Sequence, residues 1–194
     1  SKVPLDLSCA AQLEGVTEVW CPSLHSLDAF KNAGVKEEKM QVIPHGVDTQ
    51  VFNPQAIPHP NFARLDGYKF LFVGGWKDGV KDRKGLDILV KAFCAEFKKG
   101  EKTSLTAKIN LSYGGSPQQI MQEIESLGLP PKNERPSLML VFEQLPEKQL
   151  ASVYTAHDCF VMPTKADGFC MPCAEAMASG LPVIATGYGG QAEY

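Results

Sequence analysis

The chain has 194 residues, of which 44% are hydrophobic and 21% are charged, and its formal net charge is −3. This composition is typical of a soluble globular protein, and the lack of basic clusters argues against a nucleic-acid partner. No apolar stretch approaches the ~20 residues that span a membrane, and no signal-peptide pattern is present. The six cysteines lie mostly in apolar runs, so we expect buried thiols in a reduced, cytoplasmic protein rather than disulfides.

The first 43 residues contain a strand, a helix and a second strand. Residues 16–21 are rich in β-branched and aromatic side chains, which predicts a short strand that ends before Pro22. Ser23 is a suitable N-cap for a helix that closes near Gly34, and residues 40–44 form the next predicted strand. The proline-rich stretch at 54–60 is predicted to be a linker or a surface crossing.

From residue 68 onward, strands and helices alternate with short connections. The predicted strands are 70–73, 107–111, 138–142, 158–162 and a second buried strand at 181–185. The predicted helices are 84–98, a helix around 120–127, one at 146–154, and a short one that Gly180 ends. This alternation predicts an α/β fold with a doubly wound, Rossmann-like parallel sheet.

The stretch 163–180 organises the rest of the chain. It leaves the strand 158–162 through a loop and enters the short helix, which is the usual ligand crevice of an open α/β sheet. Asp167 lies in the loop and Glu175 near the helix start, and free backbone amides there suit an anion. The layout fits a nucleotide-sugar. From the residues alone, Glu175 can equally be a favourable charge on the helix dipole, and Asp167 a solvated or capping carboxylate.

Two further loops leave strands with polar groups. After the first strand, Gly74 and Gly75 allow close approach of a ligand, and Arg83 and Lys84 supply positive charge for a diphosphate. A glycine turn beside two solvated cations is the alternative. The second loop, at 143–146, can offer amides and an apolar edge to a base. A structural role is the alternative there too.

Cys170 and Cys173 form a C-x-x-C pair near the predicted helix start. Such a pair resembles the redox motif of thioredoxin-like proteins, in which the helix lowers a thiol pKa. That motif lies early in a small domain, however, and a zinc site needs two more ligands at suitable spacing. We therefore expect no metal site, and thiol redox chemistry stays open as an alternative function.

Taken together, these motifs resemble one family, the retaining glycosyltransferases of the GT-B fold, group 1 (family 4) class. The resemblance is to their carboxy-terminal, donor-binding domain. It is carried by residues 42–48, 52–54, 72–75, 83–89 and 154–164, and by the spacing from Asp167 to Glu175, which is similar to the family's Glu-x7-Glu motif.

The resemblance implies a role for each site residue. Asp167, Arg83 and Lys84 would be catalytic, with Asp167 facing the transferred sugar and the two cations neutralising the diphosphate. Glu175 would bind the ribose hydroxyls. The implied donor-binding residues are Gly74, Gly75, Gln144, Leu145, Gly168, Phe169, Cys170, Met171, Pro172 and Glu175.

Three residues depart from the family's pattern. Asp167 replaces the usual glutamate, so its side chain is one methylene shorter. Cys170 stands where glycine is common, and Gly75 stands where many members have arginine.

The resemblance also implies a domain plan. Residues 1–43 would end an amino-terminal acceptor domain, 44–67 would connect the domains, and 68–194 would be the donor domain, truncated at its carboxyl terminus. Because the chain starts without methionine and stops just after a Gly-Gly turn, we expect a piece of a longer protein, inactive alone.

The implied activity is metal-independent transfer of a sugar, with retention, from a UDP-, GDP- or ADP-sugar. The acceptor would be a sugar, glycan, lipid or protein, and no cofactor is expected. The alternatives are an inactive nucleotide-sugar-binding module, a phosphorylase-like or synthase relative acting on glucan, and the thiol redox protein.

Overall fold

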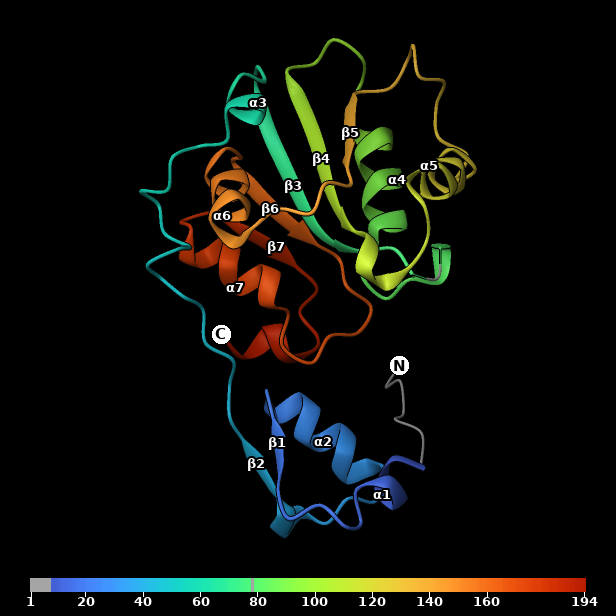
Figure 1. Cartoon of the computed structure of the whole chain (residues 1–194). Coiled ribbons are helices and arrows are strands. Elements are labelled where there is room, and N and C mark those ends of the chain that lie inside the picture. The colour runs from blue at the N-terminus through green and yellow to red at the C-terminus, as the bar shows by residue number, and fades with distance from the viewer. Residues whose placement is uncertain (1–7, 78) are drawn as a thin grey trace. The chain divides into compact units, whose positions relative to one another are not determined.

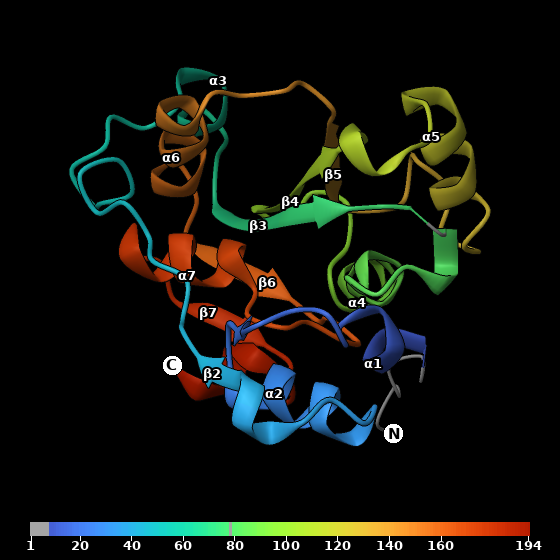
Figure 2. The ribbon, with the colours of Figure 1, turned by 60° about the horizontal axis from the view of Figure 1, so that its bottom comes forward.

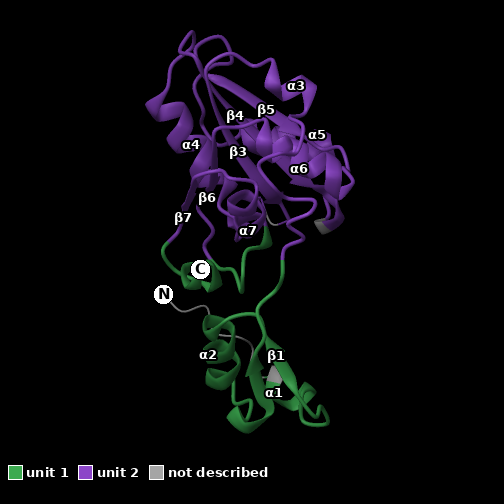
Figure 3. Ribbon diagram, turned by 90° about the vertical axis from the view of Figure 1, so that its left-hand side faces the viewer, with its two compact units in different colours: residues 1–46, 166–171, 187–194 green, residues 47–165, 172–186 purple. Residues whose placement is uncertain are grey.

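A computed structural model describes residues 8–77 and 79–194 and divides the chain into two compact units (Figure 3). The first unit comprises residues 1–46, 166–171 and 187–194, and the second comprises 47–165 and 172–186. The predicted plan of an acceptor-domain end, a connector and a donor domain stays a prediction.

The first unit contains a two-stranded parallel sheet and short helices. Its elements are α1 (Ser8–Gln12), β1 (Val19–Cys21), α2 (Leu24–Asn32), β2 (Met40–Val42) and the 3-10 turns Glu37–Lys39 and Gly190–Glu193. The predicted N-cap is confirmed, because Ser23 Oγ accepts a hydrogen bond from Ser26 N at 3.0 Å. Leu27 and Phe30 of α2 pack on a small buried cluster, whereas Trp20 of β1 is 65% exposed.

The second unit is a three-layer α/β structure. Its strands are β3 (Tyr68–Gly75), β4 (Thr103–Asn110), β5 (Ser137–Val141), β6 (Cys159–Met162) and β7 (Val183–Ala185). Its helices are α3 (Pro60–Ala63), α4 (Leu86–Glu96), α5 (Pro117–Glu125), α6 (Glu147–Thr155) and α7 (Met171–Ala178), with 3-10 turns at Gly79–Lys81 and Leu111–Tyr113.

All neighbouring strands of this sheet are parallel, in the order β5-β4-β3-β6-β7 (Figure 1). The chain therefore winds outward in one direction from β3 through β4 to β5, and in the other from β6 to β7. This confirms the predicted doubly wound, Rossmann-like sheet. The strand order reverses between β3 and β6, which is where ligands bind in open α/β sheets.

Different helices cover the two faces of this sheet (Figures 1 and 2). On one face the rings of Phe70 in β3 and Phe93 in α4 lie 5.9 Å apart. On the other face the rings of Phe160 in β6 and Tyr154 in α6 lie 5.8 Å apart. Both helices bury apolar stripes on the sheet, so the core has a layer on each side of it.

Three predicted elements need correction. Strand β4 begins at 103 rather than 107, because pairing with β3 extends through polar residues that hide the apolar pattern. Helix α4 begins at Leu86 rather than 84, since Gly85 before it has a left-handed backbone with φ of 74°. The predicted buried strand at 181–185 is an edge strand: among the described residues β7 pairs only with β6, and Ile184 is 58% exposed.

Candidate functional site

The carboxyl end of β3 brings the two predicted glycines beside a buried lysine. Gly74 and Gly75 are the last residues of β3. A Cβ added at Gly74 would lie only 2.8 Å from Phe72 Cζ and 3.5 Å from Lys84 Cγ. Lys84 itself is 9% exposed, so its stem packs beside the Gly74 backbone. The Lys84 stem therefore occupies the space beside Gly74 in which a ligand was predicted to approach the backbone.

A buried aspartate shapes the loop that carries the two predicted cations. Asp82 is 4% exposed, and its carboxylate accepts hydrogen bonds from Lys77 N at 2.8 Å and Lys84 N at 2.7 Å. The Arg83 side chain is exposed. This arrangement holds Lys84 inward and Arg83 outward at the start of α4.

The loop after β6 is tied to the same place. The Arg83 carbonyl accepts hydrogen bonds from Lys165 N at 2.6 Å and from Thr164 Oγ1 at 2.9 Å. Lys165 Nζ also lies 3.1 Å from Asp87 Oδ1 in the first turn of α4. The two loops that leave the sheet where its strand order reverses are thus joined by backbone and side-chain bonds.

Glu175 is held by a tyrosine that the sequence analysis did not single out. Tyr154 in α6 is fully buried, and its hydroxyl donates to Glu175 Oε2 at 2.7 Å. Burial raises the pKa of the Glu175 carboxyl, while the hydrogen bond from Tyr154 lowers it and the charge of Glu147 raises it. A half-buried, oriented carboxylate of this kind can accept hydrogen bonds from a diol.

The predicted base-binding loop is linked to the end of β4. Gln144 is exposed, and its Nε2 donates to Asn110 Oδ1 at 2.9 Å and lies 3.4 Å from Ser112 Oγ. Leu145 beside it is half-buried. The loops after β4 and β5 therefore form one polar edge with an apolar neighbour.

The loop 166–171 belongs to the first unit, and its carboxylate caps its own backbone. Asp167 Oδ1 accepts from Cys170 N at 2.9 Å and lies 3.4 Å from Phe169 N. The Gly168 carbonyl accepts from Ser23 Oγ at 2.5 Å. The Tyr194 hydroxyl lies 2.6 Å from the Phe169 carbonyl oxygen. Asp167 therefore acts as a capping carboxylate in this structure, and it contacts the amides of two predicted donor-binding residues, Phe169 and Cys170.

Cys170 has a backbone conformation that favours glycine. It is the non-glycine residue with positive φ in the described chain, at 68°. A cysteine in this left-handed conformation, at a position where glycine is common in the family, is strained by about 1–2 kcal/mol. Met171 and Pro172 follow it as the first two residues of α7.

Some of the predicted site residues belong to the second unit and the others to the first. The second unit holds Gly74, Gly75, Arg83, Lys84, Gln144, Leu145, Pro172 and Glu175, and the first holds Asp167, Gly168, Phe169, Cys170 and Met171. The sequence analysis missed the polar groups that support them, which are Asp82, Asn110, Tyr154, Thr164 and Lys165. Most of these residues contact segments that are distant in the sequence, and a local sequence pattern does not predict such contacts.

The cysteines whose side chains the structure describes lie in its interior. Cys21, Cys94, Cys159, Cys170 and Cys173 are all buried, which confirms the expectation of small buried side chains; the side chain of Cys9 lies outside the described residues. A redox thiol needs access to its partner. Burial of both cysteines in the C-x-x-C pair gives the redox alternative no support.

Two kinds of feature are absent from the described residues. Among them, no three His, Cys, Asp or Glu side chains group closely enough to hold a metal ion. In the same part of the chain, no helix has the length and apolar character to cross a membrane.

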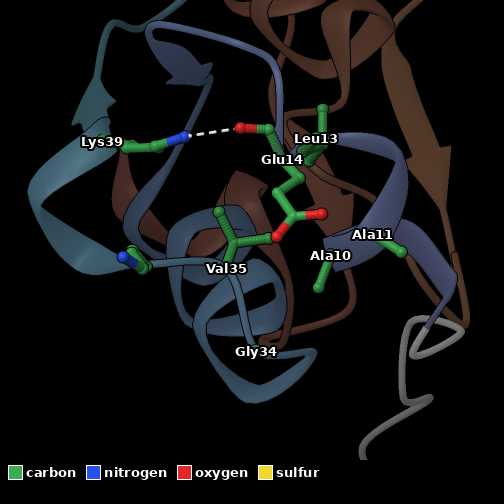
Figure 4. Close-up of a pocket in the computed structure, with 8 residues that line it drawn as sticks. Ala10, Ala11, Leu13, Glu14, Gly34, Val35 and Lys39 are labelled. Carbon is green, nitrogen blue, oxygen red and sulfur yellow. Dashed lines mark hydrogen bonds between the residues drawn. The ribbon is translucent and has the colours of Figure 1, made fainter.

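The first unit has a separate small hollow of about 280 Å³ beside α1 (Figure 4). Its lining is mostly small or apolar, with Lys39 Nζ donating to the Glu14 carbonyl at 2.9 Å. None of the predicted donor-binding residues lines this hollow.

Comparison with known proteins gives one family. The profile of the family described as glycosyl transferases group 1 matches residues 67–194. The D-inositol 3-phosphate glycosyltransferase of Paenarthrobacter aurescens is 32% identical over 162 residues, which are 81% of this chain and 37% of the relative. The mannosylfructose-phosphate synthase of Agrobacterium fabrum is 26% identical over 174 residues, with 83% and 35% covered.

Solved structures show the same fold. The crystal structure of HepE from Anabaena in complex with UDP-glucose is similar, with a TM-score of 0.68 and 23% identity. The similarity covers 96% of this chain and 50% of HepE. The chain spans about a third of the length of the two curated relatives.

Proposed function

Because this chain belongs to the group 1 glycosyltransferases, we propose that it binds the nucleotide-diphospho-sugar donor of an enzyme that transfers the sugar to an acceptor. The transfer retains the anomeric configuration and needs no metal ion. The printed names of the relatives support a sugar-transfer reaction, and the HepE complex supports a nucleotide-sugar donor.

The observation that carries this proposal is the Tyr154–Glu175 pair. Its carboxylate is held at 2.7 Å by a fully buried hydroxyl, in the helix that follows the loop at the reversal of strand order. Such a carboxylate accepts two charge-assisted hydrogen bonds from the vicinal hydroxyls of a ribose. A charge kept only for the helix dipole needs no buried partner.

Lys84 and Arg83 act on the diphosphate. As the sugar bond breaks, negative charge grows on the leaving nucleoside diphosphate, and fixed cations stabilise that charge in the transition state. The Asp82 carboxylate sets the Lys84 backbone through a 2.7 Å hydrogen bond, which reduces the reorganisation needed on binding.

Asp167 and its loop contact the transferred sugar. A carboxylate has about four acceptor positions, so Asp167 can cap the loop and still accept a sugar hydroxyl. Because Asp167 also accepts from the amides of Phe169 and Cys170, it fixes the shape of the loop as well as contacting the sugar.

Retention follows from attack by the acceptor on the face that the leaving diphosphate occupies. The acceptor and the groups that activate it come from outside the donor-binding part, and closure excludes water from the breaking bond. We therefore expect residues 1–194 alone to transfer nothing.

A thermal-shift panel of UDP-, GDP- and ADP-sugars on the complete gene product tests the donor proposal. A concentration-dependent rise in Tm with one of them is expected, because a ligand that binds the native state stabilises it. Product analysis by NMR then reports the anomeric configuration, and activity in EDTA reports metal independence. An absence of any shift across the panel would reject the proposal.

A binding module without catalysis is the second candidate. The observation in its favour is Asp167, which is shorter than the family's glutamate and is engaged in capping its loop. Tight donor binding without turnover or donor hydrolysis, in an assay with a range of acceptors, would select it.

A further inference from the structure

The loop 166–171 is bonded through its backbone carbonyl groups to two other segments of the first unit. The Asp167 carbonyl accepts a hydrogen bond from Gly190 N at 2.9 Å. The Gly168 carbonyl accepts one at 2.5 Å from the hydroxyl of Ser23, which is the N-cap of α2. The first half of the loop is therefore fixed by α2 and by the last 3-10 turn of the chain.

One side chain, Tyr194, bonds the next two carbonyl groups of the loop. Its hydroxyl lies 2.6 Å from the Phe169 carbonyl oxygen and 2.8 Å from that of Cys170, so the two acceptors share its single hydrogen. The Tyr194 ring also packs on the Phe169 ring, with 4.9 Å between their centroids. Four successive carbonyl groups, at 167–170, thus have hydrogen-bond donors from elsewhere in the first unit.

Close packing limits the freedom of the loop to shift. A Cβ added at Gly168 would lie 2.9 Å from the hydroxyl oxygen of Ser26, and one added at Gly190 would lie 1.9 Å from the Gly168 carbonyl oxygen. Ser26 is itself buried in the first turn of α2. Since interiors packed this closely do not deform continuously, the loop keeps one position unless α2 or the turn moves with it.

The loop needs this support because Cys170 has a strained backbone, with φ of 68°. A non-glycine residue keeps such a conformation only where the surrounding contacts fix it, and residues of this kind cluster at functional sites. Contacts fix Cys170 at both of its backbone polar groups. Asp167 Oδ1 accepts from its N–H at 2.9 Å, and the Tyr194 hydroxyl lies 2.8 Å from its carbonyl oxygen. The first contact is internal to the loop, whereas the second comes from outside it.

We infer that Tyr194 is a positioning residue for the transferred sugar: its hydroxyl holds the carbonyl groups of Phe169 and Cys170, and so fixes the loop through which Asp167 contacts the sugar. This inference rests on the proposed function and adds a residue to it. The side chains proposed for the ribose and the diphosphate, Glu175 and Lys84, are carried by other elements, in the second unit. A change at Tyr194 should therefore act on the sugar and spare the nucleoside diphosphate.

The test compares Tyr194→Phe with the unmodified gene product by calorimetry, using UDP-glucose, GDP-mannose and ADP-glucose beside UDP, GDP and ADP. The substitution keeps the ring that packs on Phe169 and removes only the hydroxyl. It is expected to weaken the most tightly bound nucleotide sugar about three- to tenfold, as for one lost hydrogen bond, and to leave its nucleoside diphosphate within about twofold. With a matched acceptor, kcat should fall by a similar factor, because the sugar is less well placed for the reaction.

Tyr188→Phe is the matched control. Tyr188 is an exposed tyrosine in the same carboxy-terminal segment, and its ring contacts that of His25 at 4.9 Å. Its hydroxyl forms no hydrogen bond with the residues that the structure describes. The control should therefore leave both affinities and kcat unchanged.

Each other outcome has a defined meaning. An equal loss for the nucleotide sugar and its diphosphate overturns the inference, and so does a Tyr194→Phe variant that keeps all affinities and kcat. A variant that is unfolded by circular dichroism also overturns it, because the hydroxyl would then be required for the fold. In these cases the unmodified protein still binds its donor, and the proposed function stands. Failure of the unmodified protein to bind any of the six nucleotides rejects the proposed function itself.

Discussion

Glu175→Gln separates the binding role of the carboxylate from its effect on stability. The substitution keeps the shape and an oxygen that can accept the 2.7 Å hydrogen bond from Tyr154, but it removes the charge. Hydrogen bonds to a charged group contribute about 1.5–3 kcal/mol, against about 0.5–1.5 kcal/mol for neutral ones. For two ribose hydroxyls the loss is therefore about 2–3 kcal/mol, or roughly 30- to 150-fold in Kd.

Glu175→Gln should weaken nucleotide binding but raise the stability of the fold at neutral pH. Burial raises the pKa of Glu175, so the folded state binds its proton more tightly than the unfolded state does. The carboxyl therefore favours folding below its unfolded pKa, and this contribution is lost as pH rises through the raised folded value. At neutral pH the buried charge opposes folding, so Glu175→Gln should raise Tm there, and its advantage should shrink in acid.

Calorimetry with the nucleoside diphosphate and thermal melts from pH 4 to 8 measure both effects. Glu147→Gln is the matched control, because Glu147 is exposed at the start of α6 and acts on Glu175 only through its charge. It should leave Kd nearly unchanged. Unchanged nucleotide affinity in Glu175→Gln would refute the assignment of this carboxylate to the ribose.

Three further experiments test individual features. Lys84→Met should weaken nucleoside diphosphate binding about tenfold or more and leave nucleoside binding intact, and an equal loss for both ligands would contradict its role at the phosphates. Cys170→Gly should change the free energy of unfolding by less than about 1 kcal/mol, because φ is 68° there, whereas Cys173→Gly inside α7 should cost about 2 kcal/mol. Similar costs in urea melts would show that the strain is absent. Gly85→Ala should destabilise more than Gly100→Ala, since both have positive φ but only at Gly85 would a Cβ clash, at 2.1 Å from a carbonyl oxygen. Equal unfolding free energies would count against that loop contact.

The sequence by itself determined the order and type of the main elements of the second unit. Regular alternation of apolar runs with amphipathic segments is a local property, and short connections leave few topologies other than a doubly wound parallel sheet. The same pattern predicted that Gly74, Lys84 and Glu175 follow or flank the carboxyl ends of strands. Their roles toward a donor stay predictions.

The tertiary structure decided which of these residues have partners and which face of the sheet they occupy. Glu175 and Tyr154 are 21 residues apart in the chain, and Arg83 and Thr164 are 81 apart. Strand register and crossover direction create such contacts, and local periodicity contains neither. The exposure of Ile184 and the burial of Lys108 have the same origin: β7 pairs along one side only, while β4 is covered on both faces and flanked on both sides. Whether a side chain is buried depends on what packs against its strand, and only the folded chain supplies that neighbour.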